Sequence, residues 1–198
     1  MKKFHCILVG IDCSPPSASA LREAIRLAAY DDTQVIAVHV IEQELANAIG
    51  QSLRLDGLGV IAHVRKGVEN FITHAGIDAG DVGLEVLIGH PFVALVKECE
   101  RNKADLLVMG SRGSHHGINQ VGAVAAKCVR KAPPDVLVVK EDITGPHRRV
   151  IACVDLSETS AKAVQVARRI AEQDGAALDC LFVDQTSLAL ATDYGGYL

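Results

Sequence analysis

The chain of 198 residues lacks the features that define several large classes of protein. It has no stretch approaching the roughly 20 apolar residues of a membrane-spanning helix, so we expect no membrane partner. The net charge is −4, and acidic and basic residues are intermixed, so we expect no nucleic-acid partner. With 49% apolar and 22% charged residues, the composition is that of a globular protein and excludes a disordered one.

Metal-site and export signals are also missing. The cysteines form no Cys-x-x-Cys pair, and His115-His116 has no third ligand at suitable spacing, so no metal site is predicted. The apolar run after Met1-Lys2-Lys3 is broken at Asp12 and lacks a cleavage site for a signal peptide. The cysteines fall mostly in apolar segments and are expected to be reduced core residues of a cytoplasmic protein: Cys6, Cys13, Cys99, Cys128, Cys153 and Cys180.

Apolar runs alternate with amphipathic segments along the first 140 residues. This alternation predicts crossover units and an α/β fold, which we expect to be a doubly wound five-stranded parallel sheet of order 3-2-1-4-5 with helices on both faces. Strands are expected at residues 4–11, 34–41, 82–88, 105–109 and 136–139. Helices are expected after Ser14, around residues 61–72, over 91–101 and over 121–131.

The segment from Met109 to Ala123 joins an apolar strand to a helix through a loop dense in glycine. A helix N-terminus presents unpaired N–H groups and the positive end of the helix dipole, and phosphates commonly bind there. Gly110 and Gly113 lack a Cβ atom, so they can adopt positive φ and let the backbone approach a ligand closely. A surface loop that only needs to turn is the alternative interpretation.

Asp12 follows the first strand directly. In a sheet of order 3-2-1-4-5 the first and fourth strands are neighbours at the switch point, where ligands bind beyond the carboxyl ends of the strands. We therefore expect Asp12 beside the glycine loop, where it could accept hydrogen bonds from a base or a ribose hydroxyl, or help to hold a metal near phosphates. The alternative is an acidic residue that only forms the turn before the helix.

These residues resemble the universal stress protein family over residues 3–140, and the resemblance implies a five-stranded parallel sheet between helices. The ATP-binding branch of that family carries Gly, two residues, Gly, nine residues, then Gly followed by Ser or Thr. Gly110 and Gly113 fit this pattern, but only eight residues separate Gly113 from Gly122. Ala123 stands where the hydroxyl residue is expected, although its backbone N–H can still donate to a phosphate.

The resemblance also implies a set of nucleotide-binding residues. It places Asp12 and the backbone of Val40 beside the adenine and ribose, and Met109 and Gly110 under the nucleotide. The complete set of expected binding residues, of which the last four surround the phosphates, is Gly10, Ile11, Asp12, Val40, Met109, Gly110, Arg112, Gly113, Gly122, Ala123 and Val124. The expected ligand is ATP or another adenine nucleotide, with or without Mg²⁺.

Two functions remain open from the sequence. The first is a stress-response protein, expected to be a homodimer, in which bound nucleotide alters dimerisation or partner binding. The second is an interaction module of the same fold that no longer binds nucleotide. The glycines favour the first, whereas the shortened loop and Ala123 favour the second. There is no Gly-x-x-x-x-Gly-Lys-Ser/Thr loop and no evident catalytic base, so we expect no enzyme, or at most slow ATP hydrolysis.

The rest of the chain repeats its own beginning. Residues 12–20 align with residues 155–163 without a gap at a shift of 143. The same register holds as far as the aligned pair Val40 and Val183. We expect a complete domain over 1–141, a polar linker over 142–148, and over 149–198 a partial second domain of strand, helix and strand with a tail. Because its first strand lacks a neighbour on one side, we expect this fragment to pack against the first domain or another chain, giving a dimer or larger.

Overall fold

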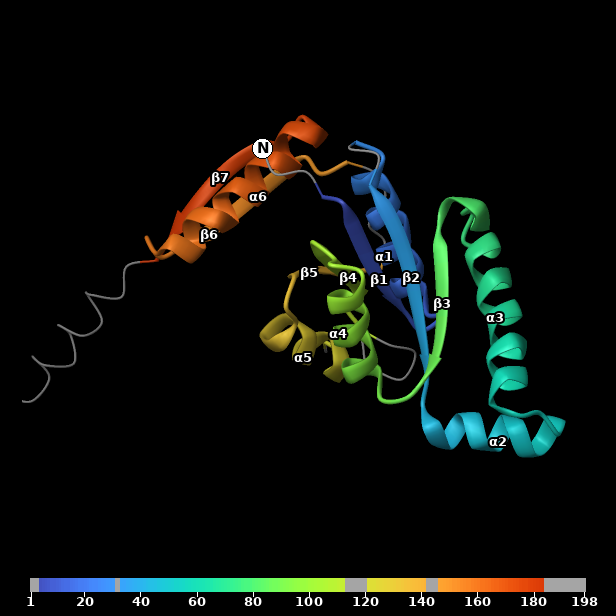
Figure 1. The fold of residues 1–198 in the computed structure, drawn as a ribbon. Coiled ribbons are helices and arrows are strands. Elements are labelled where there is room, and N and C mark those ends of the chain that lie inside the picture. Colours follow the sequence, from blue (N-terminus) through green and yellow to red (C-terminus); the bar gives the residue numbers. More distant parts are fainter. Residues whose placement is uncertain (1–3, 31–32, 113–120, 142–145, 184–198) are drawn as a thin grey trace, which may run out of the picture. The chain divides into compact units, whose positions relative to one another are not determined.

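A five-stranded parallel sheet organises the first 144 residues of the chain (Figure 1). The structure is a computed structural model that describes residues 4–30, 33–112, 121–141 and 146–183. The chain divides into a first unit, residues 2–144, and a second unit, residues 145–198. The strands of the first unit are β1 (Cys6–Ile11), β2 (Gln34–Ile41), β3 (Gly83–Ile88), β4 (Leu106–Gly110) and β5 (Asp135–Val139).

The sheet has the order β3-β2-β1-β4-β5, with every pairing parallel, and this confirms the predicted doubly wound topology. The central strands β1, β2 and β4 are short, apolar and mostly buried, as expected for a parallel sheet covered on both faces, whereas the edge strands β3 and β5 are more exposed. The helices of the first unit, which also contains a short 3₁₀ turn at Ala79–Asp81, are α1 (Pro15–Ala28), α2 (Gln43–Leu53), α3 (Gly57–His74), α4 (Pro91–Arg101) and α5 (Ala123–Lys131).

The sequence prediction missed one helix and placed the start of another two residues too early. The prediction missed α2, whose apolar residues do not form a buried stripe: Ala46 is buried, whereas Leu45 and Leu53 are exposed. The last helix of the first unit begins at Ala123 instead of Val121, and Val121 is an exposed residue before the helix. In both places the chain lies at the rim of the sheet, where apolar periodicity carries little information.

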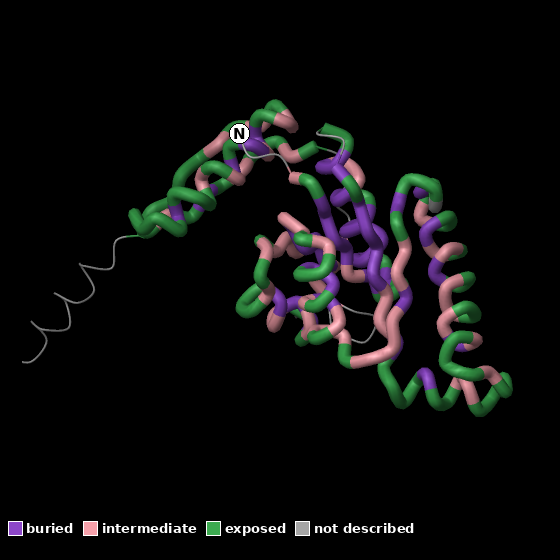
Figure 2. Tube along the Cα trace, in the orientation of Figure 1, coloured by how far each residue is buried: buried purple, intermediate pink, exposed green. Residues whose placement is uncertain are grey.

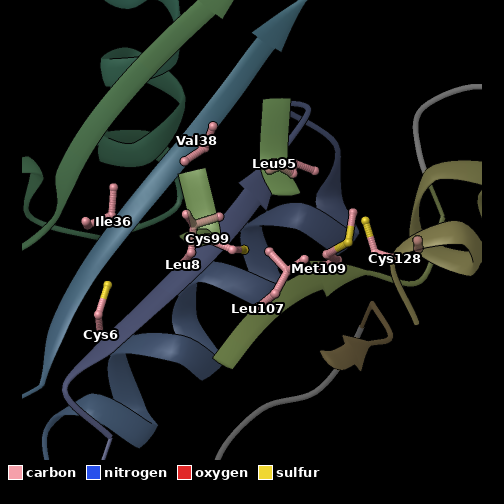
Figure 3. Packing of buried hydrophobic residues seen from close by; sticks show 10 residues of the cluster. Cys6, Leu8, Ile36, Val38, Leu95, Cys99, Leu107, Met109 and Cys128 are labelled. Atoms are coloured by element: carbon pink, nitrogen blue, oxygen red, sulfur yellow. The ribbon is translucent and has the colours of Figure 1, made fainter. Parts of the chain in front are cut away.

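Alternate residues of the strands point to opposite faces of the sheet, and each face has its own helices. One face of β1, β2 and β4 packs against α4 and α5 in a buried cluster, shown in Figure 3. The other face packs against α1, and near β3 against α2 and α3. The cluster under α4 and α5 consists of Cys6, Leu8, Ile36, Val38, Leu95, Cys99, Leu107, Met109, Ala125 and Cys128.

The second unit contains β6 (Arg149–Val154), α6 (Glu158–Asp174) and β7 (Ala177–Phe182), with β6 and β7 parallel. This confirms the predicted strand, helix and strand. The exposure is different, because Figure 2 shows buried strands in the first sheet and largely exposed strands in this pair. The boundaries of a complete and a partial domain remain predictions.

The repeat is reproduced at atomic level in the turn between the first strand and helix of each unit. Asp12 Oδ1 accepts a hydrogen bond from the Ser14 N–H at 3.0 Å, and Asp155 Oδ1 accepts one from Ser157 N–H at 3.0 Å. The residue between each pair has positive φ, 61° at Cys13 and 64° at Leu156. The sequence shift of 143 therefore aligns equivalent structural positions.

The prediction that the cysteines are core residues was wrong for three of the six. Cys6, Cys99 and Cys128 are buried, but Cys13, Cys153 and Cys180 are exposed. Burial raises the pKa of the Cys99 thiol to about 12 and that of Cys128 to about 11. Within the described residues, no helix is long and apolar enough to cross a membrane, and no group of three or more potential ligands is placed to hold a metal ion.

Candidate functional site

A cavity of about 490 Å³ opens beyond the carboxyl ends of β1, β2 and β4. Because β1 lies between β2 and β4, this is the switch point of the sheet, where open α/β sheets bind ligands. The volume lies within the roughly 300–1,000 Å³ typical of small-molecule sites. The first turns of α2, α4 and α5 complete the walls.

The floor of the cavity is apolar. Val38, Leu95 and Met109, labelled in Figure 3, belong with Ala125 to the buried cluster beneath α4 and α5. All four residues also line the cavity. Val40 and Pro91 extend this surface toward the opening. An apolar floor of this kind suits a flat ring, because it buries ring surface without leaving polar groups unpaired.

The expected binding residues in the described part of the chain all line this cavity. The structure thus brings together groups from the end of β1, the end of β2, the end of β4 and the start of α5. Gly113 lies in the stretch 113–120, outside the described residues. The residues brought together are Gly10, Ile11, Asp12, Val40, Met109, Gly110, Arg112, Gly122, Ala123 and Val124.

Asp12 forms the turn and also lines the cavity. Its Oδ1 accepts from the backbone N–H and the hydroxyl of Ser14, and Ser14 in turn accepts from the Ser17 N–H as the N-cap of α1. The turn-forming interpretation is therefore correct for Oδ1. A carboxylate has two oxygens, so the same side chain can hold the turn and accept a hydrogen bond from a ligand.

Gly110 has a packing role that the sequence did not predict. It does not adopt positive φ, and a Cβ atom built on it would lie 2.9 Å from the Pro16 carbonyl carbon and 3.0 Å from Ser17 N. Non-bonded carbon atoms normally lie about 3.5–4.0 Å apart. The glycine is therefore required because the N-terminus of α1 packs directly on β4.

The end of the cavity near α5 has two features that bear on anion binding. Gly122 N–H donates to Ser111 O at 2.9 Å, so that amide is engaged within the protein. Gly122 is the N-cap of α5 and provides no capping side chain, and the amides of Ala123 and Val124 follow in the first turn. Amides at this position have no partner within the helix.

Among the described residues, the charged groups that line the cavity are predominantly acidic. Asp12, Glu42 and Glu44 line it, whereas Arg112 donates to Glu141 in an ion pair that offsets its charge. Sequence reasoning missed Glu42, Glu44 and Leu45 because it missed α2. It also missed His39, whose ring Nδ1 lies 3.0 Å from Ile11 O at the end of β1. His39 could have been predicted, because it lies near the end of the strand that neighbours β1 and is therefore close to Asp12.

Comparison with known proteins agrees with this architecture. Residues 3–140 match the sequence model of the universal stress protein family. The chain is 30% identical over 149 residues to universal stress protein MJ0531 of Methanocaldococcus jannaschii, with 70% of this chain and 83% of the relative covered. It is 31% identical over 145 residues to universal stress protein Rv1636 of Mycobacterium tuberculosis, with 70% and 98% covered.

Two solved structures resemble the fold. Universal stress protein UspA from Lactobacillus plantarum has a TM-score of 0.57 at 21% identity, with 70% of this chain and 99% of that chain covered. A universal stress protein in complex with cAMP has a TM-score of 0.51 at 25% identity, with 71% and 100% covered.

Proposed function

The chain belongs to the universal stress protein family, and on this premise we propose that the cavity at the switch point binds an adenine nucleotide. The observation that carries this proposal is the convergence of Asp12, Val40 and the first turn of α5, whose N-cap Gly122 has no side chain, on one cavity. A related protein of the same family has been solved in complex with cAMP, which supports an adenine nucleotide as the ligand class.

In the proposed complex the adenine lies on the apolar floor formed by Leu95 and Met109, beside the backbone of Val40. Asp12 accepts a hydrogen bond from a ribose hydroxyl. The phosphate lies at the N-terminus of α5, where the amides of Ala123 and Val124 donate to it and the helix dipole favours negative charge. Because Ala123 has no hydroxyl, this interaction is carried by backbone amides.

The acidic lining bears on which nucleotide is bound. Each additional phosphate charge is repelled by Asp12, Glu42 and Glu44, and the cation of Arg112 is already paired with Glu141. We therefore propose that AMP or a cyclic monophosphate binds better than free ATP, and that ATP binds with Mg²⁺, which neutralises part of its charge. In this proposal the protein is a cytoplasmic homodimer that binds the nucleotide without catalysing a reaction. The bound nucleotide alters dimerisation or contacts with a partner.

A second function, an interaction module without nucleotide, is favoured by two observations. Gly110 is explained by its contact with α1, so it no longer counts as a sign of a ligand. The Gly122 amide is engaged by Ser111 O. A measurement on the whole chain distinguishes the two functions.

The experiment is titration calorimetry of the whole chain with adenosine, AMP, cAMP and ATP, the last with and without Mg²⁺. Ala123→Pro removes one amide N–H at the first helical position, where proline is tolerated, and the extended ψ of 144° at Gly122 suits the residue before proline. We expect AMP to bind about tenfold more weakly or worse to this variant, since a hydrogen bond to a charged group contributes about 1.5–3 kcal/mol. Adenosine has no phosphate, so its affinity is expected to be unchanged.

Asp12→Asn tests the other end of the ligand. Asparagine keeps an oxygen for the turn that caps α1 but removes the negative charge. We expect weaker adenosine binding, with the melting temperature nearly unchanged. Failure of the wild-type chain to bind any of these ligands at millimolar concentration would eliminate nucleotide binding and leave the interaction module.

A further inference from the structure

Arg112 is the only arginine or lysine among the described residues that line the cavity. Its Nη2 donates to Glu141 Oε2 in an ion pair, and Glu141 itself does not belong to the cavity lining. Within the described part of the lining, the one permanent cation is therefore paired with a carboxylate that lies outside the cavity.

Two hydrogen bonds of the neighbouring Ser111 place this pair at the end of the cavity that α5 forms. The Ser111 N–H donates to Val139 O at 2.7 Å, and the Gly122 N–H donates to Ser111 O at 2.9 Å. Ser111 thus connects the end of β5 to the N-cap of α5, and Arg112 follows it directly. The Arg112–Glu141 pair therefore lies close to the first turn of α5, where the phosphate is placed in the proposed complex.

We propose that Glu141 sets the number of phosphates that the cavity accepts, because its carboxylate competes with the ligand for Arg112. This inference rests on the proposed function, since it takes the first turn of α5 as the phosphate site. A guanidinium binds carboxylates and phosphates with the same planar set of donors, so the two groups are direct competitors. Glu141 is a positioning residue, because it acts on the ligand only through Arg112.

The charges around the cavity determine which ligands this competition disfavours. Asp12, Glu42 and Glu44 contribute negative charge to the lining, and the Glu141 carboxylate offsets the positive charge of Arg112. The attraction between a cation and a ligand is proportional to the charge of the ligand. Removal of the competing carboxylate therefore has no effect on the affinity for adenosine, a moderate effect for AMP and the largest effect for free ATP.

The ion pair can exchange partners at little cost in folding stability. The side chains of Arg112 and Glu141 are 24% and 35% exposed, so both charges remain partly hydrated. Ion pairs in such positions contribute little to the free energy of unfolding. We therefore expect loss of the Glu141 charge to change ligand affinity while the melting temperature of the ligand-free chain stays nearly constant.

The test is titration calorimetry of the whole chain with adenosine, AMP and ATP, the last without Mg²⁺. Glu141→Gln removes the competing charge and keeps the size of the side chain. We expect this variant to bind ATP at least about tenfold more tightly than the wild type does, which is the scale of one hydrogen bond between charged groups. The gain is expected to be smaller for AMP, absent for adenosine, and reduced at high salt.

Three further variants separate competition for Arg112 from other effects. Glu69→Gln on α3 also removes a carboxylate paired with an arginine, but outside the cavity lining, and is expected to bind all three ligands like the wild type. Glu141→Asp keeps the charge and is expected to keep the wild-type order of affinities. In the double variant of Glu141→Gln and Arg112→Gln the gain in ATP affinity is expected to disappear, because the cation is absent.

The outcomes distinguish this inference from the proposed function. If the wild type binds AMP and Glu141→Gln leaves the ratio of ATP to adenosine affinity unchanged, competition for Arg112 is overturned while nucleotide binding stands. Equal weakening of all three ligands with a lower melting temperature would also overturn it, since that result indicates a structural ion pair. A gain for ATP that persists without Arg112 would mean that Glu141 repels the ligand directly. If neither chain binds any ligand at millimolar concentration, both proposals are overturned.

Discussion

Replacing Gly110 by alanine tests whether this glycine serves packing or ligand binding. The added Cβ would lie 2.9 Å and 3.0 Å from two carbon atoms of Pro16 and 3.0 Å from Ser17 N. Two of these three atoms are backbone, and α1 is held at this end by the Ser14 cap, so the contact cannot be relieved by rotating a side chain. Relief requires the helix to move away from β4.

Overpacking of this kind destabilises by about 1–3 kcal/mol. For a domain of this size, 1 kcal/mol shifts the melting temperature by roughly 2–4 °C, so we expect a decrease of about 3–10 °C. The matched control is Gly10→Ala on the neighbouring strand. There the new Cβ would lie 3.4 Å from the Leu95 methyl carbons and 3.5 Å from Met109 Cε, an ordinary contact with flexible side chains.

The assay is urea and thermal unfolding of the whole chain followed by circular dichroism, with the transition of the first unit fitted separately because two units need not unfold together. Gly10→Ala is expected to stay within about 1 kcal/mol of the wild type. If Gly110→Ala is as stable as the wild type and loses only nucleotide affinity, the close approach of α1 is not the reason for the glycine.

Three further outcomes are expected. Because burial raises the pKa of Cys99 to about 12 and of Cys128 to about 11, both should resist iodoacetamide at pH 8 in the folded protein, while mass spectrometry finds the exposed Cys180 modified. Leu156 is 82% exposed and has a φ of 64°, so Leu156→Gly should stabilise the second unit by about 1 kcal/mol in urea unfolding. Hydrogen bonds from Ser157 lower the pKa of Asp155. The contribution of the Asp155 carboxylate to stability is therefore complete above the usual pKa of an aspartate and is lost as the pH falls through the lowered value. NMR titration of this carboxyl should give a midpoint below 3.8.

The sheet could be predicted from the sequence because its central strands β1, β2 and β4 are mostly buried and therefore appear as continuous apolar runs. Residues 34–41 and 91–101 were predicted with the boundaries that the structure has. The position of the cavity followed from the same topology, since a sheet of order 3-2-1-4-5 brings the ends of β1 and β4 together, whereas Val40, Ala123 and Val124 were expected from the family resemblance.

Other features depend on neighbours that the local sequence does not specify. The need for glycine at position 110 arises from Pro16, which lies far away in the chain. The exposure of Cys153 arises because nothing in the described part of the second unit takes the place of α4 and α5. Glu42 and Glu44 line the cavity because α2 turns across the end of β2, and a helix with one buried residue leaves little apolar pattern to detect.

The weak attachment of α2 has a consequence for the kinetics of ligand binding. This helix forms one wall of the cavity, yet Ala46 is its single buried side chain, and its ends are set by an extended Glu42 and a left-handed Arg54. Elements with little buried apolar surface open locally at a free energy far below that of global unfolding. Amide exchange in α2 should therefore be faster than in the sheet, and a ligand can enter and leave through local opening of this helix while every strand pairing of the sheet stays intact.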